Sequence, residues 1–188
     1  MKEAKKGKRK VYYVDAAHFV HGNFLGYIWS FVRYFVKTPS GRQRLNVLGA
    51  LDACSKKIVT ITNTSYINAQ TICDLLIKLR SQQKKGPITL ILDNARYQRC
   101  QLVMEKAKDL KIELLYLPPY SPNLNLIERF WKFMKKQCLY CKYYKTFSAF
   151  EMALTNFINH AHIKHKDELD SLLTLNFQDF SKVHVIAE

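Results

Sequence analysis

The chain has 188 residues, of which 48% are hydrophobic, and it contains only 6 glycines and 5 prolines. This composition excludes disordered, collagen-like and low-complexity proteins, and the length suits one compact domain. The 30 lysines and arginines against 15 aspartates and glutamates give a formal charge of +15, which indicates a polyanionic partner such as nucleic acid. Because no apolar run approaches the ~18 residues that span a bilayer and no secretory signal follows the basic start, we expect a cytoplasmic, nucleoid-associated protein.

The chain begins with a strongly basic segment. Residues 1–10 hold six basic residues and one acid, a pattern typical of a solvated tail. No repeat or Ser/Gly-rich linker follows. We therefore expect a basic tail over 1–10 and a single domain over 11–188.

Strand-like and helix-like segments alternate after residue 10. Five apolar, β-branched segments predict strands: Val11–Ala16, Leu45–Asp52, Lys57–Asn63, Ile88–Leu92 and Glu113–Tyr116. Helical spacing predicts helices over about 68–82 with Asn68 as N-cap, over about 97–110, from Pro122 onwards with Ser121 as cap, and over about 148–161. We expect the first three strands to form an antiparallel meander and the later ones to be parallel, because they alternate with helices. The fold class is α/β: a mixed sheet of about five strands with helices on both faces.

Two aspartates each follow a predicted apolar strand. Asp15 comes after the run VYYV and Asp93 after ITLIL. A carboxylate at the end of a buried strand costs free energy unless it is paired or hydrogen-bonded. Each aspartate alone could serve a turn, but ligand sites in open α/β sheets lie at the carboxyl ends of strands. On adjacent strands the two carboxylates would meet there.

A third carboxylate, Glu128, lies in the predicted helix after Pro122. It sits at the margin of an apolar stripe with helical spacing, which consists of Leu124, Ile127, Trp131 and Met134. The opposite side carries four basic residues that we expect to contact a DNA backbone: Arg129, Lys132, Lys135 and Lys136. The alternative for Glu128 is a surface ion pair with Lys132, worth about 0.2–0.5 kcal/mol.

Carboxylates at these three positions suit hard divalent cations. Mg²⁺ uses few protein carboxylates and keeps several waters. Two such ions ~3.5–4 Å apart can activate a water or a 3′-hydroxyl and stabilise the leaving oxygen. We therefore expect Asp15, Asp93 and Glu128 to be the catalytic residues and the ligands of two Mg²⁺ ions, which Mn²⁺ could replace.

The segments around these acids resemble the three signature blocks of DDE transposases: VDAAH at Asp15, ILDNARYQ at Asp93 and LPPYSPNLNLIERFWK at Glu128. The 34 residues between the second and third acids resemble the mariner-type branch, which includes many bacterial insertion sequences. The resemblance covers about residues 11–165. It implies a ribonuclease H-like fold with the acids as a metal triad in which Asp15 bridges both ions. It also implies cleavage of double-stranded DNA at transposon ends, strand transfer by the released 3′-hydroxyl, and action as a dimer or larger assembly.

Three polar residues near the triad have two interpretations each. His18 could orient a water, a phosphate or a triad carboxylate, and so belong to the DNA-contacting set, or could be a structural histidine. Asn94 and Asn125 could hydrogen-bond triad members or DNA, and each could equally be a cap.

Cysteine and tryptophan residues offer weaker signals. Cys138 and Cys141 have the spacing of half a zinc site, but two small residues on one helix face explain the spacing as well. Trp29 and Trp131 are expected in the core rather than as base-stacking platforms.

The chain departs from the family pattern in three respects. Ala16 stands where relatives often carry Glu, and Gln98 where they often carry His. Only ten residues precede Val11, so we expect no N-terminal helix–turn–helix domain, and the chain could be a separately encoded half, a frameshift product or a degraded remnant. A non-catalytic, transposase-derived DNA-binding module and another ribonuclease H-like nuclease remain the alternatives to an active transposase domain.

Overall fold

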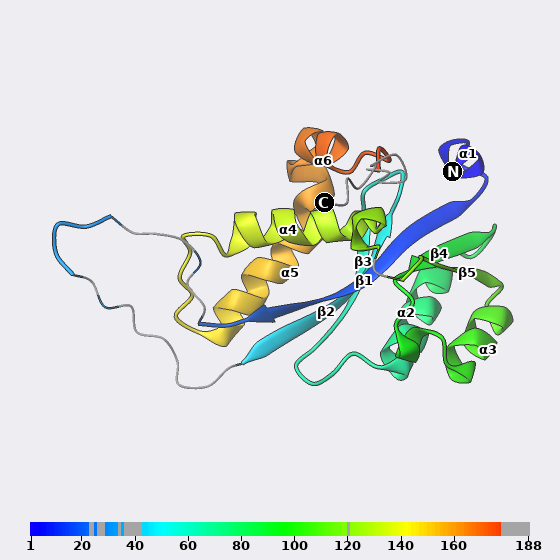
Figure 1. Cartoon of the computed structure of the whole chain (residues 1–188), viewed down its shortest axis with the longest axis horizontal. Helices are drawn as coiled ribbons and strands as arrows, with labels where there is room; N and C mark the ends of the chain where they lie inside the picture. Colours follow the sequence, from blue (N-terminus) through cyan, green and yellow to red (C-terminus); the bar gives the residue numbers. More distant parts are fainter. Residues whose placement is uncertain (23–24, 26–28, 34, 36–42, 120, 178–188) are drawn as a thin grey trace, which may run out of the picture.

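The computed structural model describes residues 1–22, 25, 29–33, 35, 43–119 and 121–177. A single five-stranded sheet of order β3-β2-β1-β4-β5 lies at its centre (Figure 1). Its strands are β1 (Lys10–Val20), β2 (Arg44–Asp52), β3 (Ile58–Asn63), β4 (Ile88–Leu92) and β5 (Ile112–Tyr116). β1, β2 and β3 form an antiparallel meander, whereas β4 and β5 are parallel to β1. The predicted sheet and its mixed topology are confirmed.

Helices cover both faces of the sheet (Figure 1). α2 (Ala69–Gln82) and α3 (Gln101–Asp109) pack on one face, and α4 (Leu126–Cys138) and α5 (Phe147–Lys164) on the other. The remaining elements are short: α1 (Lys2–Lys5), α6 (Lys166–Leu172) and two 3₁₀ turns, η1 (Arg96–Gln98) and η2 (Pro122–Leu124). Within the ranges described above, no helix is long and apolar enough to cross a bilayer.

β1 divides the interior into two cores, because its side chains alternate between the faces. Tyr13, Ala17 and Phe19 pack with α4 and α5, whereas Tyr12 and Val14 pack with α2 and α3. This alternation decides which polar residues of β1 can meet the later helices.

The helix boundaries agree with the sequence at α2 but not at α4. Asn68 caps α2 as predicted, since its side chain accepts from the Thr71 amide while the Thr71 hydroxyl accepts from the Asn68 amide. The predicted helix start at Pro122 is wrong. Pro122–Leu124 forms one 3₁₀ turn, and α4 begins at Leu126 because Asn125 has an extended backbone, with φ −90° and ψ 105°.

The basic segment over residues 1–10 differs from a solvated tail. It contains α1, whose Ala4 is buried, and Lys10 is already the first residue of β1. The Arg9 guanidinium makes ion pairs with Glu3 at 2.8 Å and with Glu113 at 2.6 Å. The segment therefore packs against the edge of the sheet, because the ion pair between Arg9 and Glu113 links it to β5.

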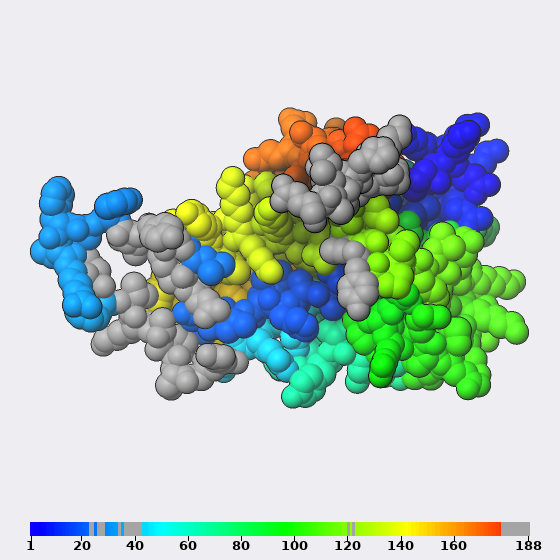
Figure 2. All heavy atoms as spheres, viewed as in Figure 1, coloured from blue at the N-terminus to red at the C-terminus, as the bar shows by residue number. Residues whose placement is uncertain are grey.

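The long connection between β1 and β2 carries exposed aromatic residues. Trp29 is 97% exposed and Phe35 81% exposed, while the Phe31 side chain is also fully accessible. Figure 2 shows the atoms of residues 29–33 standing apart from the body of the molecule. The expected core position is therefore wrong for Trp29, whereas Trp131, at 3% exposed, confirms it.

Candidate active site

Asp15 and Asp93 lie at the same level on neighbouring parallel strands. The last paired residues of β1 and β4 are Tyr13 and Ile91, and each aspartate follows two residues later. β4 ends at Leu92, but β1 continues to Val20, so the prediction that the first strand ends near Asp15 is wrong. Asp15 lies in the middle of β1, and its side chain is on the same face of the strand as those of Tyr13 and Ala17, which is the face covered by α4.

α4 brings Glu128 to this place. The helix packs across β1 and β2, and its buried side includes Ile127 and Trp131, which flank Glu128 on the helix surface. Opposite Asp15 on β2 lies Gly49. A Cβ atom at Gly49 would stand 2.6 Å from the Trp131 ring, so the absence of a side chain allows α4 to approach the sheet closely.

The charges of the three acids act on one another. Burial raises the pKa of Asp15 to about 7, together with the neighbouring negative charges of Glu128 and, more weakly, Asp93. The nearby Trp131 indole lowers this pKa in part, although its Nε1 makes no hydrogen bond of normal geometry. Glu128 and Asp93 thus lie within electrostatic reach of Asp15, which is half-buried, whereas the other two carboxylates are exposed.

Polar atoms without partners concentrate around these acids. Seven buried side-chain nitrogen and oxygen atoms in the described residues have no hydrogen bond. Five of them belong to four residues that lie within five positions of an acid in the sequence: Asn94, Gln98, Asn125 and Trp131. Unsatisfied buried groups are rare in native proteins and mark places where a water or an ion completes the network.

The donor set fits a divalent cation by its chemistry. Asp15, Asp93 and Glu128 supply hard carboxylate oxygens, and their mutual repulsion is the electrostatic situation that a cation relieves. In the described part of the chain, however, no group of three or more His, Cys, Asp or Glu side chains is arranged so that it could hold a metal ion. The orphaned amide and indole groups are suited to hydrogen-bond the waters that Mg²⁺ keeps.

A family model, described as DDE superfamily endonuclease, matches residues 10–151. The chain belongs to this family. The resemblance carried by the three sequence blocks is therefore confirmed, and the matched range includes all three acids.

Other known proteins are similar to this chain in sequence or in fold. An uncharacterized 39 kDa protein of insertion element IS630 from Shigella sonnei is 30% identical over 99 residues, which are 52% of this chain and 29% of that protein. The Mos1 strand transfer complex is similar in fold, with a TM-score of 0.60 at 14% identity over 88% of this chain and 52% of the Mos1 chain. The Mos1 transposase catalytic domain bound to raltegravir and Mg gives a TM-score of 0.58 at 12% identity, with 92% and 84% covered. The fold is ribonuclease H-like, and the chain spans less than a third of its curated relative.

The basic residues of α4 divide into two groups. Lys132, Lys135 and Lys136 are exposed. Arg129 instead donates hydrogen bonds to the carbonyl of Leu172, the last residue of α6, and to those of Thr174 and Asn176 in the segment that follows. Its guanidinium therefore holds the C-terminal segment on α4, while the three lysines stay available for a phosphate backbone.

His18 is not brought to the triad. Its side chain is on the same face of β1 as that of Val14, which faces α2. Its Nδ1 lies 2.7 Å from the Oδ1 of Asn46 on β2. Asn94 follows Asp93 with a positive φ of 77°, which Asn tolerates better than most residues. Its buried Oδ1 has no partner.

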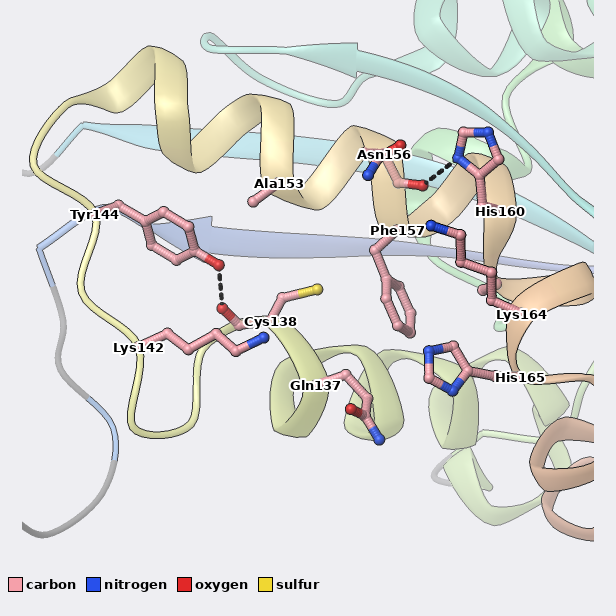
Figure 3. Close-up of a pocket in the computed structure, with 11 residues that line it drawn as sticks. Gln137, Cys138, Lys142, Tyr144, Ala153, Asn156, Phe157, His160, Lys164 and His165 are labelled. Atoms are coloured by element: carbon pink, nitrogen blue, oxygen red, sulfur yellow. Dashed lines mark hydrogen bonds between the residues drawn. The ribbon is translucent and has the colours of Figure 1, made fainter.

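The zinc interpretation of Cys138 and Cys141 gains no support. Figure 3 shows Cys138 at the end of α4, beside a cavity of about 270 Å³ that α5 also lines. Cys141 is exposed, and the nearby histidines have other partners: His160 bonds the Asn156 carbonyl and His165 bonds Glu168. Burial raises the pKa of Cys138 to about 11, which disfavours the thiolate that zinc needs.

Two neighbours of the acids escaped the sequence analysis. Burial, followed by the charge of Asp93 and then that of Asp15, raises the pKa of Tyr97, so this side chain lies beside both aspartates. Nothing in the local pattern marks it. Gly49 did carry a signal, because an isolated glycine within a strand indicates close approach of another backbone or side chain.

Proposed function

We propose that this chain is the catalytic domain of a transposase, which cleaves DNA at transposon ends and transfers the strands in a metal-dependent reaction. One observation carries the proposal. In a member of the DDE superfamily endonucleases, the half-buried Asp15 carboxylate experiences the charges of both Glu128 and Asp93.

In this proposal Asp15, Asp93 and Glu128 hold two Mg²⁺ ions, which Mn²⁺ can replace. Bound cations would activate a water for cleavage, activate the 3′-hydroxyl for strand transfer, and stabilise the leaving oxygen. The protein contributes orientation. Asp15 is held by the sheet, while the Trp131 indole beside it supports its charged form. The desolvation of Asp15 strengthens its electrostatic interactions.

Double-stranded DNA is the proposed substrate and partner. The charge of +15 and the exposed lysines of α4 support this partner, as do the solved Mos1 assemblies, which include paired end complexes. We expect the protein to act at the nucleoid. Self-association on DNA is proposed by analogy with the Mos1 paired end complex, and the exposed Trp29, Phe31 and Phe35 offer apolar groups that could take part in it.

Residues 11–188 form the catalytic unit in this proposal. The chain spans 52% of the Mos1 chain in the strand transfer complex. Selective recognition of transposon ends would therefore come from a separate DNA-reading region, carried by the same or by another polypeptide.

A nicking assay on duplex DNA carrying the transposon ends tests the activity. We expect products only with Mg²⁺ or Mn²⁺, and Asp93→Asn should lower the rate by more than about 10²-fold, since metal stabilisation is worth several kcal/mol. DNA affinity should stay nearly unchanged. Asp109→Asn, the same change at an exposed residue ending α3, is the matched control and should retain full activity.

The alternatives give different results. Salt-sensitive DNA binding without metal-dependent products would favour a non-catalytic binding module. Preferred cleavage of an RNA–DNA hybrid or of branched DNA would favour another ribonuclease H-like nuclease. Equal loss of binding and cleavage in Asp93→Asn would contradict the triad.

A further inference from the structure

Asn125 occupies the N-cap position of α4 but does not cap the helix. Its side chain makes no hydrogen bond to the first turn, and the residue is 2% exposed. Its Nδ2 instead donates to the main-chain carbonyl of Val14, at 3.1 Å. A residue so deeply buried cannot contact DNA, so the hydrogen bond to β1 needs another explanation.

The accepting carbonyl lies where β1 loses its neighbour. Val14 comes one residue after Tyr13, the last residue of β1 that pairs with β4. Beyond this point the sheet offers β1 fewer main-chain donors, and a buried carbonyl without a partner is costly. Asn125 supplies a donor directly before Asp15 in the chain.

A second hydrogen bond extends the connection into α4. The Glu128 amide donates to the Asn125 carbonyl at 3.1 Å. Val14, Asn125 and Glu128 therefore form a short series of hydrogen bonds, with Asp15 next to one end and Glu128 at the other. Because the first turn of α4 has no side-chain cap, this series attaches the helix start to the strand through polar groups.

We propose that Asn125 is a positioning residue that sets the placement of Glu128 relative to Asp15. The inference rests on the proposed function, because it concerns two of the proposed metal ligands. The residue acts through the strand and the helix, and it touches neither DNA nor the reacting atoms. Its buried Oδ1, which has no partner, remains able to accept a hydrogen bond from a water.

The test compares Asn125→Ala and the isosteric Asn125→Asp with the wild-type chain, and uses Asn159→Ala at an exposed residue of α5 as control. Mn²⁺ affinity is measured by calorimetry without DNA, and kcat and KM are measured on transposon-end DNA below each variant's unfolding midpoint. We expect both Asn125 variants to lose about 10–100-fold in kcat and in Mn²⁺ affinity, as for other residues that orient metal ligands. KM for DNA and the control should not change.

Peptide-level amide hydrogen exchange on the metal-free protein gives a readout independent of cleavage. In Asn125→Ala, exchange should accelerate at the first turn of α4 but not at its buried middle, around Met134. If the wild type neither binds Mn²⁺ nor cleaves, the proposed function fails, and this exchange pattern alone then decides whether Asn125 attaches the helix.

Three results would overturn the inference. Unchanged Mn²⁺ affinity and kcat in a folded Asn125→Ala variant would remove the positioning role. A raised KM with unchanged kcat would indicate a DNA contact instead. Activity that returns fully when the temperature is lowered would mean that the residue serves stability alone.

Discussion

Substitution of Gly49 by alanine tests how closely α4 must approach the sheet. An added Cβ would lie 2.6 and 2.7 Å from Trp131 Cζ2 and Cη2, and 3.0 Å from Ile127 Cδ1. Trp131 cannot turn aside easily, because it packs edge-on against Phe19 and Phe130, with ring centroids 6.1 and 5.5 Å away. Its exposed fraction is only 3%.

The cost follows from the overlap. Carbon atoms at ordinary contact are about 3.5–4.0 Å apart, so the helix or the indole must move by roughly 1 Å. Overpacking of this kind costs about 1–3 kcal/mol. Alanine recovers about 0.5–1 kcal/mol of backbone entropy in a strand, so we expect a net loss of about 1–2 kcal/mol. For a domain of this size, the unfolding midpoint should fall by roughly 2–8 °C.

Thermal unfolding and the nicking assay measure the two consequences. Because the displaced helix carries Glu128, cleavage by Gly49→Ala should fall even where the protein stays folded. The shorter ring of Trp131→Phe should relieve the clash, so that the double variant loses less stability than the two single changes together. An unchanged or raised midpoint with full activity in Gly49→Ala would refute close packing over Asp15.

Four further predictions follow from the charges and exposed groups. Burial opposes ionisation of Asp52, yet hydrogen bonds from Lys10 and from the Ser55 and Cys54 amides lower its pKa. The ionised carboxylate therefore stabilises the folded protein above pH ~4, and this stabilisation is lost as the pH falls through the folded-state pKa. Asp52→Asn should lower the free energy of unfolding by about 1–3 kcal/mol at pH 7 and by progressively less in acid. Because burial and neighbouring negative charges raise the pKa of Asp15 to about 7, its ionisation destabilises the metal-free protein above pH ~4 and does so fully above pH 7. Asp15→Asn should therefore raise the metal-free free energy of unfolding at pH 8 by no more than about 4 kcal/mol and leave it unchanged near pH 4. Alanine at Lys132, Lys135 and Lys136 should make the DNA-binding constant less sensitive to salt, so that the slope of its logarithm against the logarithm of the salt concentration falls by about 0.9 for each lost phosphate contact. An unchanged slope would exclude this face of α4 from DNA binding. Serine at Trp29 and Phe31 should shift the DNA-bound complex toward monomers in sedimentation, and an unchanged assembly would show that this connection does not mediate self-association.

Local sequence patterns determined much of this protein. Apolar, β-branched runs located all five strands, and the Asn68 cap located the start of α2, because these features depend on neighbouring residues. The scarcity of acids in a chain of charge +15 drew attention to Asp15, Asp93 and Glu128. The mixed directions of the strands then followed from the alternation of strands and helices in the second half, which favours parallel neighbours.

Only the tertiary structure decided the details that place these acids. β1 continues past Asp15 because Ala17 and Phe19 pair with Val47 and Leu45 of β2, a long-range contact that no local propensity reports. α4 begins late because the Asn125 side chain bonds a strand more than one hundred residues earlier in the chain. The same pairing turns His18 to the opposite face from Asp15. Local propensity describes what a segment can form, whereas the register of a strand and the approach of a helix depend on partners that are distant in the chain.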